Sequence, residues 1–360
     1  MLQNHNPTAP PEQKKHEWEP RHFATFVGQN PLVRQLRVEA SAAAKTIRPV
    51  RHCLFSGLAG TGKSLIARIL AWESFNVPIV EVKGKGLTHL DLTAAMNSMP
   101  TDGYDAKGHL VDVENAHFPT LIIDEIDGLE RGICQILHDV LAPPQNNRWS
   151  YQGITSKGVR RCWHPGCCVI GLTNFLGSLL QKDEALVSRF PIQYSFDPYE
   201  TEALTLLIAQ YAEQNACAID DDAAELLASR ANGVPRAAIT LFQRAVDVYL
   251  STMDAPVHID YQTASEMLTL IEVDENGLDR SMRAYLKALV VSNGRLSIQA
   301  LASVLQNDQD SLLRIVEPVL MRRGFVIRTS GGREITLAGR KALGGETGDD
   351  LNNGREIIDD

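Results

Sequence analysis

Long apolar runs are absent from this sequence of 360 residues. A helix that crosses a membrane needs about 20 consecutive apolar residues, and even the apolar stretch at 65–72 is interrupted by Arg68. Residues 1–15 are polar, contain proline, and lack the basic start and apolar centre of a secretion signal. We therefore expect a protein that has no membrane segment and stays in the cytoplasm.

Cysteine is also scarce, with six residues spaced irregularly along the chain. In a reducing cytoplasm such spacing favours free thiols over a disulfide framework. Cys162, His164, Cys167 and Cys168 lie close together, but theirs is not the regular spacing of a zinc finger. The sequence leaves a metal site at this cluster open.

The length, at roughly 150 residues per domain, indicates two or three domains. Between residues 18 and 197, short β-branched or apolar runs alternate with helical patterns, which predicts an α/β domain built on a parallel sheet. We expect buried strands at 52–56, 79–82, 120–123 and 168–172.

Strand signals disappear between residues 198 and 273, where apolar residues recur at three- and four-residue spacing. This pattern predicts a small helical domain. We expect its helices at 203–212, 222–231 and 236–250. A leader at 1–17 and an acidic, glycine-bearing tail at 344–360 are expected to be disordered.

Residues 274–343 combine three helical patterns with two short strand patterns, which predicts a winged helix. Serine and aspartate are favoured N-caps, and a glycine pair is a hairpin signal. We expect the strands at 325–328 and 334–337. The expected caps are Asp279, Ser297 and Asp310, and the expected turn is at Gly331 and Gly332.

Positive charge is in short supply overall, since 35 basic residues stand against 44 acidic ones and the net charge is −9. This balance argues against a protein whose whole surface binds nucleic acid. Residues 275–341, however, hold 11 basic and 6 acidic residues. The predicted winged helix is therefore a basic module suited to phosphate groups, with a solvated surface that has no partner as the alternative.

The strongest signal is the pattern G-x-x-x-x-G-K-S at 57–64, between a predicted strand and a predicted helix. The amides of such a loop turn toward phosphates, and the helix N-terminus adds favourable potential. Lys63 would reach the β and γ oxygens of a nucleotide and Ser64 would hold Mg²⁺. The expected nucleotide-binding residues are Gly57, Gly60, Thr61, Gly62, Lys63 and Ser64.

Polar side chains follow two of the predicted strands at the sheet edge where ligands of open α/β sheets bind. Asp124 and Glu125 end the strand at 120–123. Asp124 would hold Mg²⁺ through water, and Glu125 would polarise the attacking water. Asn174, after the strand at 168–172, could orient that water or contact the γ-phosphate. The pattern predicts hydrolysis of the terminal phosphate.

Two arginines follow in the motifs Leu-x-x-Arg-Phe at 186–190 and Gly-x-Pro-Arg at 233–236. These are Arg189 and Arg236. Either guanidinium could stabilise charge on the transferred phosphate, provided that the fold brings it close.

Together these motifs occur in the order of the AAA+ ATPases. The chain from about residue 19 to 343 resembles the RuvB family of Holliday-junction branch-migration motors, with a helical lid and a winged helix after the ATPase domain. The resemblance rests on Phe-Val-Gly-Gln at 26–29, Asp-Glu-Ile-Asp-Gly-Leu at 124–129, and the stretches 316–320 and 323–329.

The resemblance implies ATP and Mg²⁺ as cofactors and assigns roles to individual residues. Asn174 would be the first sensor of the nucleotide and Arg236 the second. Val27 and Gly28 would border the adenine. Arg189 would be an arginine finger that reaches the neighbouring subunit's site, so that hydrolysis depends on a ring, expected to be a hexamer.

The winged helix of such a protein would touch the DNA backbone, here through Arg328 and Arg333 around the wing. The sequence departs from the family elsewhere. Residues 100–119 are longer than the family's link, and the segment at 147–163, which corresponds to the hairpin that docks on RuvA, matches poorly. A RuvA-like junction-binding protein is therefore one candidate partner, and the identity of the partner stays open.

The leading hypothesis is an ATP-hydrolysing DNA motor of the branch-migration type. One alternative is a nucleotide-gated DNA-binding regulator, such as a helicase loader or a transposition regulator, in which hydrolysis only times release. Another is a remodeller of protein partners whose winged helix is an interaction module.

Overall fold

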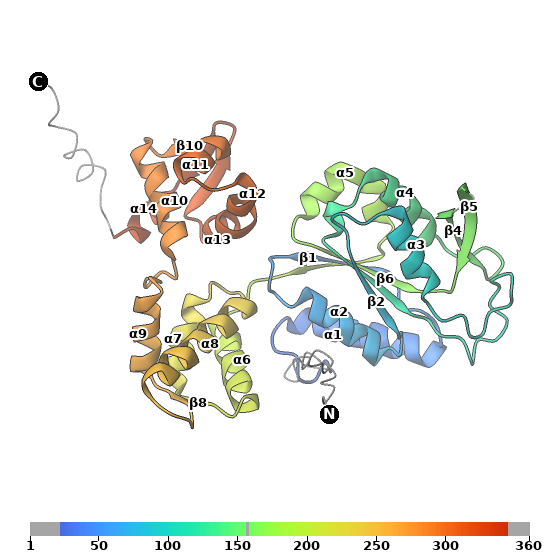
Figure 1. Cartoon of the computed structure of the whole chain (residues 1–360), viewed down its shortest axis with the longest axis horizontal. Helices are drawn as coiled ribbons and strands as arrows, with labels where there is room; N and C mark the ends of the chain where they lie inside the picture. The colour runs from blue at the N-terminus through green and yellow to red at the C-terminus, as the bar shows by residue number, and fades with distance from the viewer. Residues whose placement is uncertain (1–21, 156–157, 345–360) are drawn as a thin grey trace, which may run out of the picture.

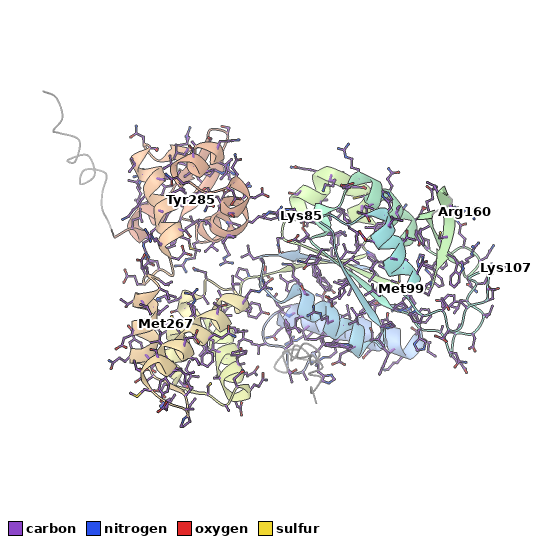
Figure 2. All side chains as sticks on the ribbon, viewed as in Figure 1. Lys85, Met99, Lys107, Arg160, Met267 and Tyr285 are labelled. Atoms are coloured by element: carbon purple, nitrogen blue, oxygen red, sulfur yellow. The ribbon has the colours of Figure 1, made fainter. Side chains whose placement is uncertain are left out.

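The computed structural model describes residues 22–155 and 158–344, which form three successive domains (Figure 1). The leader expected at 1–17 lies outside the described residues, as does the expected tail except for its first residue. Met99, Met267 and Tyr285 lie in three separate groups of side chains (Figure 2), and each belongs to a different hydrophobic core. None of the helices in the described ranges has the length and apolar character needed to span a membrane.

A five-stranded parallel sheet in the order β2-β3-β6-β1-β7 forms the centre of the first domain, which confirms the predicted α/β class. The four expected strands are present. The fifth, β7, was not expected because it is an edge strand whose residues are only alternately shielded, so it lacks a continuous apolar run. The strands are β1 (Cys53–Gly57), β2 (Ile79–Lys83), β3 (Thr120–Asp124), β6 (Cys168–Thr173) and β7 (Ile192–Phe196).

Helices cover both faces of this sheet, and its central strands are therefore buried on both sides. Helices α1 and α2 lie on one face, and α3, α4 and α5 lie on the other (Figure 1). The sheet's carboxyl edge is thereby fixed between two cores. The bounds are α1 (Asn30–Thr46), α2 (Lys63–Glu73), α3 (His89–Asn97), a 3-10 turn (Ile126–Gly128), α4 (Arg131–Val140) and α5 (Leu176–Ser188).

The long segment at 100–119 packs against a hairpin formed by β4 (Trp149–Thr155) and β5 (Gly158–His164). The ring of Tyr104 stacks on Trp163 with centroids 6.0 Å apart and meets Trp149 edge-on at 6.4 Å. Both tryptophans are half-buried and pack against the segment at 100–119. The insertion braces the base of the hairpin, and Lys107 and Arg160 lie along one outer edge of the domain (Figure 2).

The second domain is the small helical domain that the periodicity predicts, and we call it the lid. Pro235 opens α8, where the missing N–H of proline has no helical partner to lose. Two short parallel strands pair the α6–α7 connection with the α8–α9 connection. Its elements are α6 (Thr201–Gln214), β8 (Ala218–Ile219), α7 (Asp221–Arg230), α8 (Pro235–Thr252), β9 (His258–Ile259) and α9 (Tyr261–Leu270).

The third domain is a winged helix, as predicted, with a three-stranded sheet in the order β10-β12-β11. Its first helices are capped by the expected residues, since the side chains of Asp279 and Ser297 accept from Met282 and Ala300 backbone N–H groups. Its elements are α10 (Arg280–Val291), β10 (Arg295–Leu296), α11 (Ile298–Val304), α12 (Gln309–Ser311), a π-helical turn (Leu312–Val316), α13 (Glu317–Arg322), β11 (Val326–Thr329), β12 (Gly332–Ile335) and α14 (Leu337–Ala342).

Two local expectations in this domain were wrong. The third cap is Asp308, whose carboxylate accepts from the Ser311 N–H at 2.7 Å, whereas Asp310 lies inside the first turn. The wing turn lies one residue earlier than expected, because Gly332 is already paired in β12. Gly332 has φ +128°, and a Cβ there would lie 2.4 Å from the Leu296 carbonyl oxygen, so the close approach of β10 fixes a glycine inside the strand.

A buried carboxylate ties the wing to α13. Glu317 is fully buried, and its oxygens accept from Arg328 Nε at 2.5 Å and from Arg333 Nε at 3.1 Å. The Tyr285 hydroxyl also donates to it, at 3.3 Å. Arg328 and Arg333 face each other across the two wing strands. One carboxylate therefore holds both strands of the wing.

Replacing this carboxylate with an amide, in Glu317→Gln, should lower the free energy of unfolding of the third domain by about 2–3 kcal/mol. Breaking a wholly buried ion pair costs about 3–5 kcal/mol, and half-exposure of the Arg328 side chain reduces that loss. Denaturant titration would measure the change. Glu334→Gln is the control, because the exposed pair with Arg295 should contribute at most about 1 kcal/mol. Equal stability of the two variants would contradict the stabilising role of Glu317 in the wing.

Candidate nucleotide site

A cleft of about 640 Å³ lies between the first domain and the lid. It opens beside the loop at 57–64, the carboxyl ends of β3 and β6, and the first turn of α8. Such crevices at the carboxyl ends of parallel strands are where ligands of open α/β sheets bind. The residues of interest around the cleft are Phe26, Val27, Gly60, Gly62, Lys63, Ser64, Arg68, Asp124, Glu125, Asn174, Tyr199 and Arg236.

Lys63 begins α2 at the floor of this cleft, where it is only 7% exposed. Its Nζ donates to the carbonyl oxygens of Gly57 at 2.9 Å and Leu58 at 2.7 Å, and to Asn174 Oδ1 at 2.8 Å. Burial lowers the pKa of Lys63 to about 8, and the Arg236 charge adds to this, while Asp124 opposes it. The ammonium is therefore held by neutral oxygens that a phosphate can replace.

The two predicted carboxylates lie together at the end of β3. The Glu125 N–H donates to Asp124 Oδ1 at 3.0 Å, and Glu125 itself has left-handed backbone angles of φ 52° and ψ 48°. This turn separates the directions of two neighbouring side chains that both line the cleft. A carboxylate from Asp124 and a hydroxyl from Ser64 are hard oxygen donors of the kind that Mg²⁺ prefers, so these residues fit that ion.

The lid contacts the loop at 57–64, which we call the phosphate loop, through a backbone hydrogen bond. The Arg236 N–H donates to the Gly60 carbonyl oxygen at 3.2 Å. A Cβ at Gly60 would lie 2.8 Å from the Arg236 Cβ, so the approach requires glycine in the loop. The fold thus brings Lys63, Asn174 and Arg236, predicted from distant motifs, to one cleft.

Three of the expected nucleotide-binding residues shape the site without lining the cleft. Gly57 has φ +140° and passes against Phe196, and Thr61 is fully buried with its Oγ1 donating to the Leu58 carbonyl oxygen. Gly28 lies beneath the Tyr199 ring, where a Cβ would meet a ring carbon at 2.3 Å. Their backbone groups remain candidates for nucleotide contact.

Arg189 lies outside its own chain's cleft. It is the exposed residue that ends α5, and its Nε donates to His138 Nδ1 at 2.9 Å. The structure therefore separates it from Lys63, Asn174 and Arg236, which line the cleft. The predicted DNA contacts Arg328 and Arg333 are in the third domain, held by Glu317, with side chains 52% and 16% exposed.

Arg68 and Tyr199 are among the cleft residues that sequence reasoning missed. Arg68 lies one helical turn beyond Ser64, and its guanidinium pairs with Glu81 through two bonds of 2.6 and 2.9 Å. The four-residue spacing from Ser64 was a usable signal, because such residues share a helix face. Tyr199, whose hydroxyl donates to the Thr61 carbonyl oxygen at 3.4 Å, carried no comparable signal in the sequence.

The turn between α7 and α8 joins the lid to the winged helix. Asn232 in this turn donates from Nδ2 to the Gly277 carbonyl oxygen at 2.8 Å, and its own carbonyl oxygen accepts from Arg322 of α13. A second contact places the Arg314 guanidinium 5.3 Å from the centre of the Phe175 ring. The winged helix thus contacts the chain directly after Asn174 and shortly before Arg236.

Across residues 22–155 and 158–344, no three side chains among His, Cys, Asp and Glu are grouped so that they could hold a metal ion. His164 Nδ1 lies 3.9 Å from Cys167 Sγ, and burial lowers the pKa of His164 to about 4 and raises that of Cys167 to about 12. Cys168 belongs to the central strand β6 and points to the Arg51 carbonyl oxygen.

Comparison with known proteins covers all three domains. Family models described as the AAA ATPase family associated with various cellular activities, the RuvB AAA lid domain and the RuvB C-terminal winged helix domain match residues 53–198, 199–274 and 275–344. The Holliday junction branch migration complex subunit RuvB of Fervidobacterium nodosum is 30% identical over 336 residues, which are 91% of this chain and 89% of that protein. This chain belongs to the RuvB family.

Other members of the family agree with this assignment. The RuvB subunit of Rubrobacter xylanophilus is 30% identical over 341 residues, covering 94% of this chain and 90% of its own. The solved structure of the Thermotoga maritima RuvB Holliday junction branch migration motor matches with a TM-score of 0.76 at 27% identity, over 92% of this chain and 99% of that one. The protein is a RuvB-type AAA+ ATPase with the three-domain organisation of that motor.

The buried lysine of this RuvB-type site predicts a pH dependence of nucleotide binding. If a nucleotide phosphate binds the charged ammonium, as the sequence predicts, the free protein loses that partner as the pH rises above the pKa of Lys63, about 8. The association constant for ATP should therefore be constant below pH 8 and fall by about tenfold per pH unit above it, with uptake of a proton on binding. Calorimetry in buffers of different ionisation enthalpy measures both quantities.

Lys63→Arg is the control, since a guanidinium stays charged over this range. A flat profile between pH 7 and 9.5 in the parent protein would contradict the lowered pKa.

Proposed function

We propose that this protein is an ATP-driven motor that moves branched duplex DNA, working as a ring of identical subunits, expected to be a hexamer, in the cytoplasm. The observation that carries the proposal is the full-length likeness to RuvB branch-migration motors, which includes the winged helix as well as the ATPase domain. A DNA-binding regulator would also use an ATPase domain and a winged helix, so what favours the motor is the likeness to RuvB motors over about nine-tenths of the chain.

The cleft residues divide the work of ATP hydrolysis. Lys63 would exchange its bonds to Gly57, Leu58 and Asn174 for bonds to the β- and γ-phosphates. Ser64 and Asp124 would hold Mg²⁺, which would neutralise charge that develops on the phosphates. Glu125 would orient and polarise the attacking water from the end of β3. Val27 and Gly28 would border the adenine.

Arg189 would complete the site of the neighbouring subunit. It lies outside its own cleft, so it can meet a phosphate only in another copy of the chain. A guanidinium aimed at the transferred phosphate is worth about 10³–10⁵ in rate, which makes the ring necessary for fast turnover. Asn174 and Arg236 would then report the state of the nucleotide to the lid.

Arg328 is the favoured of the two proposed DNA contacts. Both wing arginines neutralise Glu317, but the Arg328 side chain is half exposed, whereas that of Arg333 is mostly buried. Arg333 would hold the wing in shape, and Arg328 would contact a backbone phosphate. The hairpin of β4 and β5, braced by the insertion at 100–119, is the proposed docking place for a RuvA-like junction-binding partner.

The decisive experiment follows strand movement on a labelled four-way junction, with and without a RuvA protein. The parent protein with ATP should convert the junction into duplex products, and its ATPase activity should rise with DNA. Glu125→Gln should bind ATP and DNA but leave the junction intact, because it cannot polarise the water. Electron micrographs with an ATP analogue should contain rings.

DNA-bound assemblies with slow turnover and no strand movement would favour the nucleotide-gated regulator instead. The proposed motor function would be overturned if the ATPase activity did not respond to DNA and the Lys63→Ala variant had the same ATPase activity as the parent.

Arg328→Ala should weaken duplex binding and reduce its dependence on salt. Each lost phosphate contact lowers the slope of log K against log salt by about 0.9. Fluorescence anisotropy titrations at several salt concentrations, from about 50 to about 200 mM, would measure this slope. Arg328→Lys keeps the charge and should keep the slope. An unchanged slope in Arg328→Ala would point to the protein-remodelling alternative, in which the winged helix binds protein.

A further inference from the structure

Three side chains from two helices form a chain of hydrogen bonds that ends at the exposed Arg189. Asp183 Oδ2 lies 2.9 Å from His138 Nε2, and His138 Nδ1 lies 2.9 Å from Arg189 Nε. His138 comes from α4, and the other two residues come from α5 and its end. The side chains of His138 and Asp183 are about one-fifth exposed, so they are shielded more than Arg189 itself.

The donor and acceptor roles follow from the chemistry of the outer partners. A guanidinium Nε can only donate, so His138 Nδ1 must accept. An ionised carboxylate can only accept, so His138 Nε2 must donate to Asp183. The neutral imidazole with its proton on Nε2 satisfies both bonds at once. The carboxylate thereby selects the tautomer whose free lone pair faces Arg189.

Asp183 is held in place by a break in α5. Its backbone angles of φ −160° and ψ 84° are not helical, and its Oδ1 accepts from the Leu186 N–H at 2.9 Å, as an N-cap does for a new turn. The neighbouring Lys182 donates from Nζ to the Leu129 carbonyl oxygen at 2.9 Å. One carboxylate thus caps the last turn before Arg189 and also orients His138.

We propose that His138, oriented by Asp183, is a positioning residue for ATP hydrolysis: it grips Arg189 through Nε and aims the guanidinium at the ATP of the neighbouring subunit. This inference rests on the role of Arg189 in the proposed function. Within the described residues, neither Nη1 nor Nη2 of Arg189 has a hydrogen-bond partner, so both terminal nitrogens stay available for a phosphate. A guanidinium held at Nε presents them as a planar pair, the geometry that suits bidentate phosphate recognition.

The hydrogen bond from Arg189 to His138 restricts the conformation of the arginine before the reaction. An exposed arginine samples many rotamers, and fixing them before the neighbour's ATP arrives removes that entropy cost from the reaction. A misplacement of about 1 Å in such a group costs about 100-fold in rate. His138 therefore affects the rate at the neighbouring site without touching the nucleotide.

Two substitutions of His138 separate the bonds. In His138→Gln the side-chain amide reaches the place of Nε2 and can still donate to Asp183, but nothing accepts from Arg189. In His138→Asn the amide oxygen lies near the place of Nδ1 and can accept from Arg189. We expect kcat of the DNA-stimulated ATPase to fall about tenfold in His138→Gln and to stay within about threefold of the parent in His138→Asn.

Three further measurements distinguish positioning from a structural role. The affinity for ATP should stay within about twofold of the parent in both variants, because neither bond reaches the cleft. His138→Gln combined with Arg189→Ala should be no slower than Arg189→Ala alone, since His138 acts only through Arg189. Mixing His138→Gln subunits with Lys63→Ala subunits should restore part of the turnover, because the latter supply intact arginines to folded neighbouring sites.

Asp139→Asn is the matched control. Asp139 is the next residue of α4 and accepts from the Gln152 N–H at 3.2 Å, outside the chain of bonds to Arg189, so its kcat should equal that of the parent.

The outcomes separate this inference from the function on which it rests. If Arg189→Ala is slow but His138→Gln and His138→Asn turn over equally, the positioning role of His138 is overturned and the ring-based role of Arg189 stands. A double variant slower than Arg189→Ala also overturns positioning. If kcat of Arg189→Ala equals that of the parent, both the role of Arg189 at the neighbouring site and the positioning role of His138 are overturned.

Discussion

A buried ammonium group is the interaction on which the nucleotide site depends. Lys63 reaches its place because a glycine-rich turn delivers the start of α2 to the carboxyl edge of the sheet, where three neutral oxygens satisfy its donors. The desolvation that lowers its pKa also makes a phosphate a better partner than water. Because one of those oxygens belongs to Asn174, the lysine cannot turn to a nucleotide without releasing the end of β6.

The segment that would be released with Asn174 is in contact with the winged helix. Phe175 follows Asn174 directly and lies under the Arg314 guanidinium. On the other side of the cleft, Arg236 touches the phosphate loop through its N–H, and Asn232 in the preceding turn carries the bond from Arg322. These two contacts of the winged helix are thus made to segments next to Asn174 and Arg236, the residues proposed to sense the nucleotide. A change that moves either segment would alter its contact with the winged helix, so that nucleotide binding in the cleft could move that domain.

The parts of this site that the sequence predicts are those whose chemistry is local. The phosphate loop, Asp124 with Glu125, and Asn174 each stand at a strand end, so a motif and a strand pattern suffice to place them. The wing is different. The sequence predicts that its arginines are free to contact phosphates, yet both pair with the buried Glu317. The spacing of 317, 328 and 333 does not indicate that these side chains meet, because their contact depends on how the two wing strands pair. Asp308 displaced Asp310 as a cap for a similar reason, since two acidic residues in one turn offer equal local signals.

His138 was invisible to sequence reasoning, because it comes from α4, about fifty residues before the arginine that it holds. Its position explains how the two ends of one subunit can communicate. Lys182, next to Asp183, donates to carbonyl oxygens of the turn that follows Glu125. The segment that would orient Arg189 toward a neighbouring subunit is therefore anchored to the strand end at this chain's own cleft. A shift of Glu125 on hydrolysis would therefore reach the arginine offered to the neighbour. In the proposed ring, hydrolysis at one site would then influence the neighbouring site, because the first site would move the arginine on which the second depends.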